Sequence, residues 1–220
     1  MNNTSKPLSI LLTITLALAL LTGAIAAPIL CRPFYYAHIG PLGLEERTGL
    51  TRDEIKTAYN EMLDYCLGGE EFSTGVLRWS DSGRDHFTDV RGLFLLDLRV
   101  LVCALGTLAI LAPSILRGQT KLARLRGRGP AYWAGAGLGT VFLVVGVLAA
   151  MDFDQAFVQF HALFFPGKDN WLFDPQADQI INILPEVFFR NCAILILVLL
   201  VLGCVAFIAF DVTHTKSKKS

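Results

Sequence analysis

Apolar residues in this chain occur in four long blocks, separated by mixed or charged segments. The blocks cover residues 7–30, 93–113, 133–151 and 187–210. At about 1.5 Å per residue, each block is long enough to cross about 30 Å of hydrocarbon as a helix. The first block resembles a secretory signal segment, but its apolar run is longer than a typical signal core, so we expect a retained helix. The pattern predicts four transmembrane helices.

The first long interval, residues 31–92, contains an amphipathic pattern. Thr51 precedes Glu54 by three residues, which is a capping-box spacing. Apolar positions then recur at helical spacing. We therefore expect a helix over residues 52–66, a break at "CLGGEE", and a short strand or irregular crossing over residues 72–80.

The second long interval, residues 152–186, is rich in phenylalanine. Asp154, Phe157 and His161 follow helical spacing, so Asp154 and His161 should share one face. An amphipathic, Phe-rich helix suits the membrane interface. Asp174 stands before a proline, which is typical of an N-cap followed by proline at the first helical position. That pattern predicts a second short helix, "PQADQIINIL".

Composition and charge set the class and the orientation. The chain is 53% apolar with a mean hydropathy of +0.51, too high for an ordinary soluble domain. Residues 114–132 hold five Lys and Arg and no acid, and the tail 211–220 holds three Lys and one Asp. Residues 31–92 hold seven basic and eleven acidic residues, and 152–186 hold one Lys and six acids. The positive-inside rule therefore places the short basic loop, the tail and both termini in the cytoplasm, and both mixed segments outside.

The expected fold class is an all-α membrane protein with four transmembrane helices and an extracytoplasmic, mainly helical cap. Nucleic-acid binding is not expected, because topology and anionic lipid explain the basic loop. Three of the five cysteines lie within the spans, and no Cys-x-x-Cys or His/Cys metal spacing occurs. Whether Cys31 and Cys66 pair is left open.

Candidate chemistry gathers in "RDHFTDVRGLFLLDLRVL", residues 84–101, where charges run into an apolar block. Charged side chains are costly next to hydrocarbon and mark functional sites in membrane proteins. On a helix, His86 and Asp97 project about 20° apart, with Asp89 one turn from His86. The alternative is structural: Asp97 and Arg99 form an ion pair, and His86 belongs to the core.

Four stretches in this order, "YNEMLDYC", "DHFTDVRGLF", "FVQFHALFF" and "WLFDPQADQIINILPEVFF", resemble a family of four-span bacterial membrane proteins. The characterised members of that family are lipoprotein intramolecular transacylases. The resemblance runs from "CRPFYY" to the fourth span, although residues 67–80 and the basic loop match only in character. It implies transfer of the sn-2 acyl chain of a diacylglyceryl-Cys to the α-amine of the same Cys, giving the N-acyl, lyso form of the lipoprotein.

This reaction suits the two histidines that the sequence places outside the membrane. The attacking amine must lose a proton and the departing glycerol oxygen must gain one, which imidazoles do well near pH 7. We expect His86 to be the leading general base and acid, and His161 to be its partner or a donor to the oxyanion. Asp89 would orient an imidazole. Arg91 would hold the developing charge or a lipid phosphate, although it lies about 140° from His86 on an ideal helix. Further supporting residues are expected at Phe87, Asp97, Asp154, Phe157, Asp174 and Glu186.

The resemblance also implies a bacterial cell membrane, a site at the outer leaflet, and a lipoprotein and membrane lipid as partners. We expect a monomer without cofactor or metal, because ester-to-amide transfer is downhill and no Gly-x-Ser-x-Gly or nucleotide-binding motif occurs. One alternative is a metal-dependent hydrolase with His86, His161 and an acid such as Asp174 as ligands. The other is a non-enzymatic membrane accessory or scaffold protein whose histidines are structural.

Overall fold

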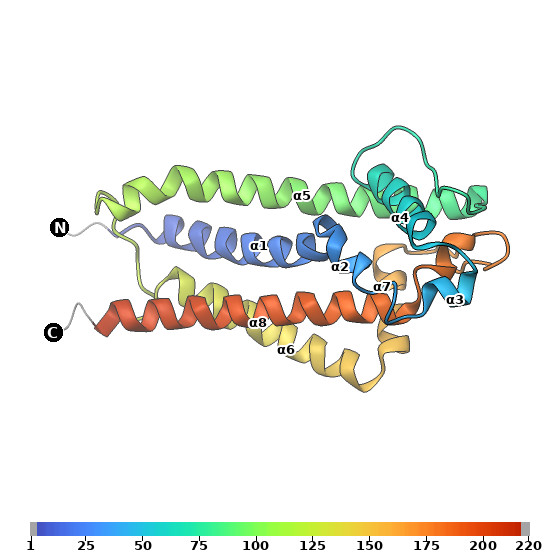
Figure 1. Ribbon diagram of the computed structural model, residues 1–220. Helices are drawn as coiled ribbons and strands as arrows, with labels where there is room; N and C mark the ends of the chain where they lie inside the picture. Colours follow the sequence, from blue (N-terminus) through green and yellow to red (C-terminus); the bar gives the residue numbers. More distant parts are fainter. Residues whose placement is uncertain (1–3, 217–220) are drawn as a thin grey trace. The chain divides into compact units, whose positions relative to one another are not determined.

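The computed structural model describes residues 4–216, and almost every ordered element in it is helical (Figure 1). The elements are α1 (Lys6–Leu30), α2 (Arg32–Tyr36), α3 (Leu44–Thr48), α4 (Arg52–Cys66), α5 (Asp81–Leu116), α6 (Pro130–Met151), α7 (Phe153–Phe164), the 3-10 helix η1 (Gln179–Asn182) and α8 (Glu186–Lys216). Within the described chain there is no strand, only two isolated bridges. Residues 72–80 take the irregular course, and the all-α class is confirmed.

Four helices are long and apolar enough to cross a membrane among residues 4–216. They are α1, α5, α6 and α8, and each contains one of the four predicted blocks. The predicted four-span class is therefore confirmed. Helix α5 is 36 residues long and begins at Asp81, well before its apolar run at Leu93. Its first three turns therefore extend beyond the span.

The chain divides into two compact units, which we describe separately. Unit 1 is drawn from Met1–Ile25, Leu98–Leu148 and Leu195–Ser220. Unit 2 is Ala26–Asp97 and Ala149–Ile194. Both segments that the sequence predicts to be external fall within unit 2.

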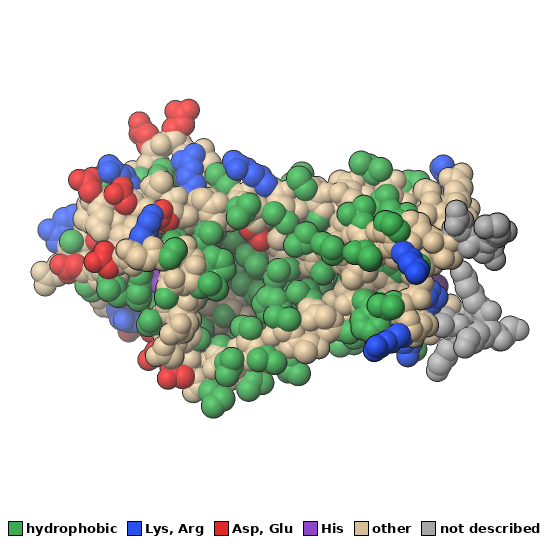
Figure 2. All heavy atoms as spheres, turned by 180° about the vertical axis from the view of Figure 1, so that it is seen from behind, with side chains coloured by type: hydrophobic (Ala, Val, Ile, Leu, Met, Phe, Trp, Pro, Cys, Tyr) green, Lys and Arg blue, Asp and Glu red, His purple; other side chains and the backbone are tan. Residues whose placement is uncertain are grey.

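Close helix contacts in unit 1 depend on glycine. A methyl group at Gly203 of α8 would overlap the side chain of Leu20 on α1. On α6, a Cβ at Gly135 would lie 2.7 Å from the carbonyl oxygen of Cys204, and one at Gly146 would lie 2.8 Å from Leu197. Small residues let helix backbones approach closely where no hydrophobic effect drives association. The outer surface of these helices is covered by hydrophobic side chains (Figure 2).

The basic loop between α5 and α6 is tied to the start of α1 and the end of α8. The Ser9 hydroxyl accepts the Ala123 N–H at 2.8 Å. The buried carboxylate of Asp211 accepts Arg124 Nη2 at 2.9 Å and the Gly129 N–H at 3.0 Å. These three parts of unit 1 therefore lie at the same end of its helices.

Helix α4 is the centre of unit 2 and follows the sequence prediction for residues 52–66. Thr51 Oγ1 accepts the Glu54 N–H at 3.3 Å, and Glu54 Oε2 accepts the Thr51 N–H at 2.8 Å. This capping box confirms the helix start. The inner face of the helix buries Ile55, Ala58, Tyr59, Met62, Leu63, Tyr65 and Cys66.

Tyr35 joins the two sequence segments of unit 2. The Tyr35 ring stacks on Tyr59 with centroids 3.8 Å apart, and the Tyr35 hydroxyl donates to the Ile183 carbonyl at 2.9 Å. Cys31 is exposed, Cys66 is buried, and both are free thiols.

The segment after Asp174 differs from the predicted helix. Asp174 Oδ1 accepts the Gln176 N–H at 2.9 Å and heads a turn, and only the 3-10 helix η1 follows. The reason is a long-range pairing: the Gln179 N–H donates to the Arg78 carbonyl at 2.9 Å, and the Arg78 N–H donates to Gln179 Oε1 at 2.9 Å. The Gln179 N–H is thus not available to donate to the Pro175 carbonyl, as it would in a continuous helix.

Candidate active site

The start of α5 is fixed by a cap whose carboxylate comes from a distant part of the chain. The Gly83 N–H donates to Ser80 Oγ at 3.0 Å. Asp178 accepts the Ser80 N–H at 2.7 Å and the Ser80 hydroxyl at 2.9 Å. In an ordinary capping box this acid is the third residue of the helix. Here that residue is Gly83, and a methyl group on it would overlap the Asp178 carboxylate.

This cap positions His86, which follows one turn later on α5. The His86 side chain is buried, with 6% of its surface exposed. Its ring lies 5.0 Å from Phe165 and 5.3 Å from Phe173, centroid to centroid. Phe87, an expected supporting residue, also lies against it at 5.8 Å. His86 Nδ1 is buried and has no hydrogen-bond partner within residues 4–216.

His161 is held on α7 by its own helix. Its Nδ1 lies 2.7 Å from the Phe157 carbonyl oxygen. A carbonyl oxygen can only accept, so Nδ1 carries the proton and the neutral ring presents a lone pair at Nε2. The ring stacks on Trp171 at 4.4 Å and lies 4.3 Å from the Phe157 ring. The imidazole is therefore fixed in both orientation and tautomer.

The structure brings the two imidazoles together. Their centroids lie 6.0 Å apart with an interplanar angle of 27°. Phe165 contacts both rings, at 5.0 Å from His86 and 5.7 Å from His161. Both histidines belong to unit 2, although 75 residues separate them in sequence. The result is a pair of titratable rings enclosed by aromatic side chains.

Burial keeps both rings neutral near pH 7. It lowers the pKa of His86 to about 4, assisted by the neighbouring His161 and opposed mainly by the charge of Asp89. Burial also lowers the pKa of His161, while the Phe157 carbonyl acts in the opposite direction. Neutral imidazoles can accept protons, which a general base requires.

Asp89 raises the pKa of His86 by its charge, and it also holds Asn170, which acts on the same ring. Its carboxylate accepts Lys168 Nζ at 2.6 and 2.7 Å and Asn170 Nδ2 at 3.2 Å. Burial raises the pKa of Asp89, but the hydrogen bonds from Lys168 and Asn170 outweigh it and lower the pKa overall. The Asn170 side chain in turn raises the pKa of His86. Its Oδ1 is buried and, like His86 Nδ1, has no hydrogen-bond partner in the described chain.

Arg91 contacts a different part of unit 2. Its guanidinium donates to the Gly69 carbonyl at 2.5 Å and to the Gly68 carbonyl at 3.3 Å, and it lies over the Tyr65 ring at 4.9 Å. These bonds fasten the end of α4 to α5. The structure records no contact between Arg91 and either histidine.

The remaining expected acids are not gathered around the histidines. Asp154 is exposed on α7 while His161 is buried, and its neighbouring carboxyl group raises the pKa of Glu186. Asp97 is half-buried, and its Oδ2 has no partner within residues 4–216. No ion pair joins Asp97 to Arg99 in the described part of the chain. Phe157, by contrast, contacts His161 as expected of a supporting residue.

Sequence reasoning missed several residues of this site. They are Ser80, Phe165, Lys168, Asn170, Trp171, Phe173 and Asp178. One available signal was that Lys168 is the sole basic residue of a strongly acidic segment. No comparable signal marks Asn170 or Asp178.

Within residues 4–216, no three His, Cys, Asp or Glu side chains gather in a way that could hold a metal ion. Asp174, the acid considered as a third metal ligand, accepts the Gln176 N–H in a turn.

Comparison with known proteins identifies the family and the fold of the chain. A family model described as "Lipoprotein intramolecular transacylase Lit" matches residues 10–189. No curated protein matches the chain. The in meso structure of the membrane integral lipoprotein intramolecular transacylase Lit from Bacillus cereus is 24% identical, with a TM-score of 0.84 over 97% of this chain and 96% of that one.

Two further structures of the Bacillus cereus protein, each with one histidine replaced, match over 97% of this chain. The form with arginine has a TM-score of 0.77, 24% identity and 92% coverage of that chain. The form with alanine has a TM-score of 0.76, 23% identity and 94% coverage. These likenesses establish the fold, and the family model covers most of the sequence. The chain belongs to the lipoprotein intramolecular transacylase family Lit.

Proposed function

We propose that this acyltransferase of the Lit family uses His86 and His161 to move the protons of lipoprotein transacylation. The substrate is a lipoprotein whose N-terminal Cys carries a diacylglyceryl thioether. Its sn-2 acyl chain passes from the glycerol oxygen to the Cys α-amine, leaving an N-acyl, S-monoacylglyceryl product. The observation that carries the proposal is the pair of buried, neutral imidazoles with centroids 6.0 Å apart.

The proton balance of the reaction supports a requirement for two bases. An N-terminal amine has a pKa of about 7.7–8.0, so much of it arrives as ammonium. In becoming an amide, that nitrogen loses two protons, and the departing glycerol oxygen gains one. One proton must therefore leave the site, and the other must pass from the nitrogen to the glycerol oxygen. A single imidazole cannot hold both protons at once.

The two rings suit different parts of this transfer. His161 presents the Nε2 lone pair, so in its neutral form it accepts a proton and does not donate one to an oxyanion. The pKa of His86 is lowered to about 4. The protonated ring therefore gives up its proton readily and can protonate the leaving glycerol oxygen. We assign the first deprotonation of the ammonium to His161 and the proton exchange during acyl transfer to His86.

The aromatic enclosure favours the amine over water as the nucleophile. Phe165 and Phe173 lie against His86, and Trp171 lies against His161. An apolar surround limits water access and protects an activated ester from hydrolysis. Because amine and ester arrive on one molecule, proximity replaces a protein nucleophile.

The charge pattern supports placing this site at the outer leaflet. The mixed segments 31–92 and 152–186 contribute both histidines, while the basic loop and tail carry the features of cytoplasmic segments. Figure 2 shows most of the acidic side chains on the face in view gathered over unit 2. We therefore propose that both termini are cytoplasmic and that the protein acts as a monomer on lipid-anchored substrates from the outer leaflet.

Mass measurement of one lipoprotein tests the proposal. The chain is expressed in a bacterium lacking its own N-acylating activity, and the N-terminal lipopeptide is weighed. Conversion of the diacylglyceryl form with a free amine to the isomeric N-acyl form, identified by fragmentation, is expected. His86→Ala should abolish conversion, since general acid–base catalysis contributes roughly 10²- to 10⁴-fold.

A matched control distinguishes the site from general damage to the fold. His38 also holds its Nδ1 on a helix carbonyl, that of Phe34 at 2.7 Å, but lies outside the histidine pair. His38→Ala should retain conversion. A free amine throughout with wild-type protein would refute the function, and a fully active His86→Ala would refute the role of that residue.

A further inference from the structure

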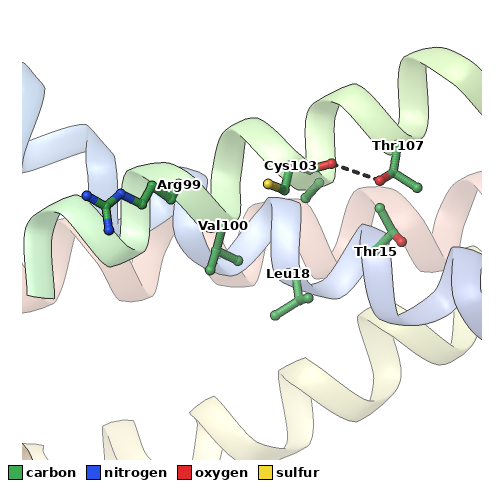
Figure 3. Close-up of a pocket in the computed structure, with 7 residues that line it drawn as sticks. Thr15, Leu18, Arg99, Val100, Cys103 and Thr107 are labelled. Atoms are coloured by element: carbon green, nitrogen blue, oxygen red, sulfur yellow. Dashed lines mark hydrogen bonds between the residues drawn. The ribbon is translucent and has the colours of Figure 1, made fainter.

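A groove in unit 1 has no role in the proposed reaction. It lies between α1 and α5 and encloses a volume of about 340 Å³. Figure 3 shows Arg99 at one end of the groove and Thr15 and Thr107 at the other. The residues that line it are Thr15, Leu18, Arg99, Val100, Cys103, Ala104 and Thr107.

Arg99 is an unusual residue for this position. It lies six residues into the apolar run that starts at Leu93, or about 9 Å along the helix. Its side chain is exposed, and within residues 4–216 the structure records no hydrogen bond or ion pair to it. A guanidinium has five N–H donors and keeps its charge. Next to hydrocarbon such a group requires an acceptor, which the described protein does not supply.

The rest of the groove is suited to an apolar occupant. Leu18, Val100 and Ala104 line it with apolar side chains. The two threonine hydroxyls are already satisfied, because Thr15 donates to the Leu11 carbonyl at 2.8 Å and Thr107 donates to the Cys103 carbonyl at 2.8 Å. The groove therefore offers one charged end and an apolar channel, which matches a lipid with an anionic head and a hydrocarbon chain.

We infer that this groove binds a membrane glycerophospholipid, with its phosphate on Arg99 and one acyl chain along α1 and α5. Charge decides between the available lipids. The diacylglyceryl-Cys of a lipoprotein has ester carbonyls but no phosphate, whereas a phosphodiester matches the full charge of the guanidinium with charge-assisted hydrogen bonds. The site is thus a second lipid site, separate in chemistry from the histidine pair.

Native mass spectrometry of the purified, delipidated full-length protein tests this site. Phosphatidylglycerol and a diacylglycerol with the same chains are added in steps. Phosphatidylglycerol should bind at least about tenfold more tightly, and Arg99→Gln should lose about the same factor, because charged hydrogen bonds are worth roughly one decade or more in affinity. Arg99→Lys should retain most of the binding. Thermal unfolding of each variant checks that the fold is intact.

Two substitutions on adjacent residues of α5 test the channel. Cys103 lines the groove, and Cys103→Phe should fill it and reduce phosphatidylglycerol binding. Val102 is 68% exposed and does not line the groove, so Val102→Phe should leave binding unchanged. Equal binding of the two lipids, or undiminished binding by Arg99→Gln, would overturn the inference. So would displacement of phosphatidylglycerol by a synthetic diacylglyceryl lipopeptide, which would assign the groove to the substrate. None of these outcomes depends on transacylase activity.

Discussion

At the scale of single residues, the site depends on how two buried rings are held. His161 is fixed in orientation and tautomer by the Phe157 carbonyl on its own helix. His86 Nδ1 has no hydrogen-bond partner in the described chain, but the Asn170 side chain raises the pKa of His86. Asn170 is itself held by Asp89, whose carboxylate accepts its Nδ2 at 3.2 Å. Asn170 is therefore the amide through which Asp89 can act on the His86 ring in addition to its charge.

We therefore expect Asn170→Leu to slow acyl transfer. Asn170 raises the pKa of His86, so its loss should make that ring a weaker base, and a polar interaction in a charged network is worth roughly 10- to 100-fold in rate. The change should fall on kcat, because the residue acts through His86 and does not contact substrate. Asn182→Leu is the control, since Asn182 donates to the Pro175 carbonyl outside the histidine pair. Equal rates for the two variants would remove Asn170 from the mechanism.

Acid stability offers a separate test of His86. Its pKa is about 4 in the folded protein against 6.5 for an unperturbed histidine. Between these values the unfolded state binds more protons, so the free energy of unfolding falls as pH falls from 6.5 to 4. One such histidine contributes a slope of at most about 1.4 kcal/mol per pH unit. Thermal unfolding in detergent should show a shallower pH dependence for His86→Gln than for wild type, and parallel curves would contradict the burial of a neutral ring.

At the scale of elements, the start of α5 depends on a carboxylate supplied from the segment before η1. Asp178 occupies the space that a side chain at position 83 would need, and it completes the cap at Ser80. Because His86 follows one turn later, the cap sets the direction in which that imidazole projects. The same bonds hold the segment that carries Asn170 and Trp171 close to α5.

Gly83→Ala should therefore destabilise the protein and lower activity. Its methyl group displaces Asp178, and loss of a helix cap costs about 0.5–2 kcal/mol. Gly92→Ala, on the same helix, meets nothing within 4 Å and should be neutral or slightly stabilising. Melting temperature and conversion of a lipopeptide would be measured for both. If Gly83→Ala behaves like Gly92→Ala, the cap is not important for the fold.

Prediction from sequence succeeded where the contacts that determine an element lie close together in the chain, and it failed where they lie far apart. Helix α4 was predicted from Thr51 and Glu54, which lie three residues apart and cap the helix by themselves. The helix after Asp174 was wrongly predicted, because the backbone N–H and the side chain of Gln179 bond to Arg78, about 100 positions away. Asn170 and Asp178 were missed for the same reason, since nothing local indicates what their side chains contact. The two histidines were found because each lies among acidic residues beside an apolar block, which is a local feature of the sequence, and the resemblance paired them.

At the scale of the whole molecule, the function requires a particular topology. In the proposed function the histidine pair faces the outer leaflet, and the positive-inside rule then places the basic loop over residues 114–132 in the cytoplasm. Because the chain crosses the membrane four times, both of its ends then lie on the same side as the basic loop. In unit 1 the loop is bonded to the start of α1 and the end of α8, as this topology requires.

Cysteine labelling in intact cells should distinguish the two sides. In a variant with Cys31→Ser, Asp53→Cys introduces a thiol at a side chain that is 92% exposed, and Arg126→Cys introduces one in the basic loop. A membrane-impermeant maleimide should label position 53 in intact cells and position 126 only after permeabilisation. The parent without either new thiol is the control, because its remaining cysteines lie in the spans or in the core of unit 2. The opposite labelling would put the histidines in the cytoplasm, where no N-terminal diacylglyceryl-Cys is presented, and the proposed site could not meet its substrate.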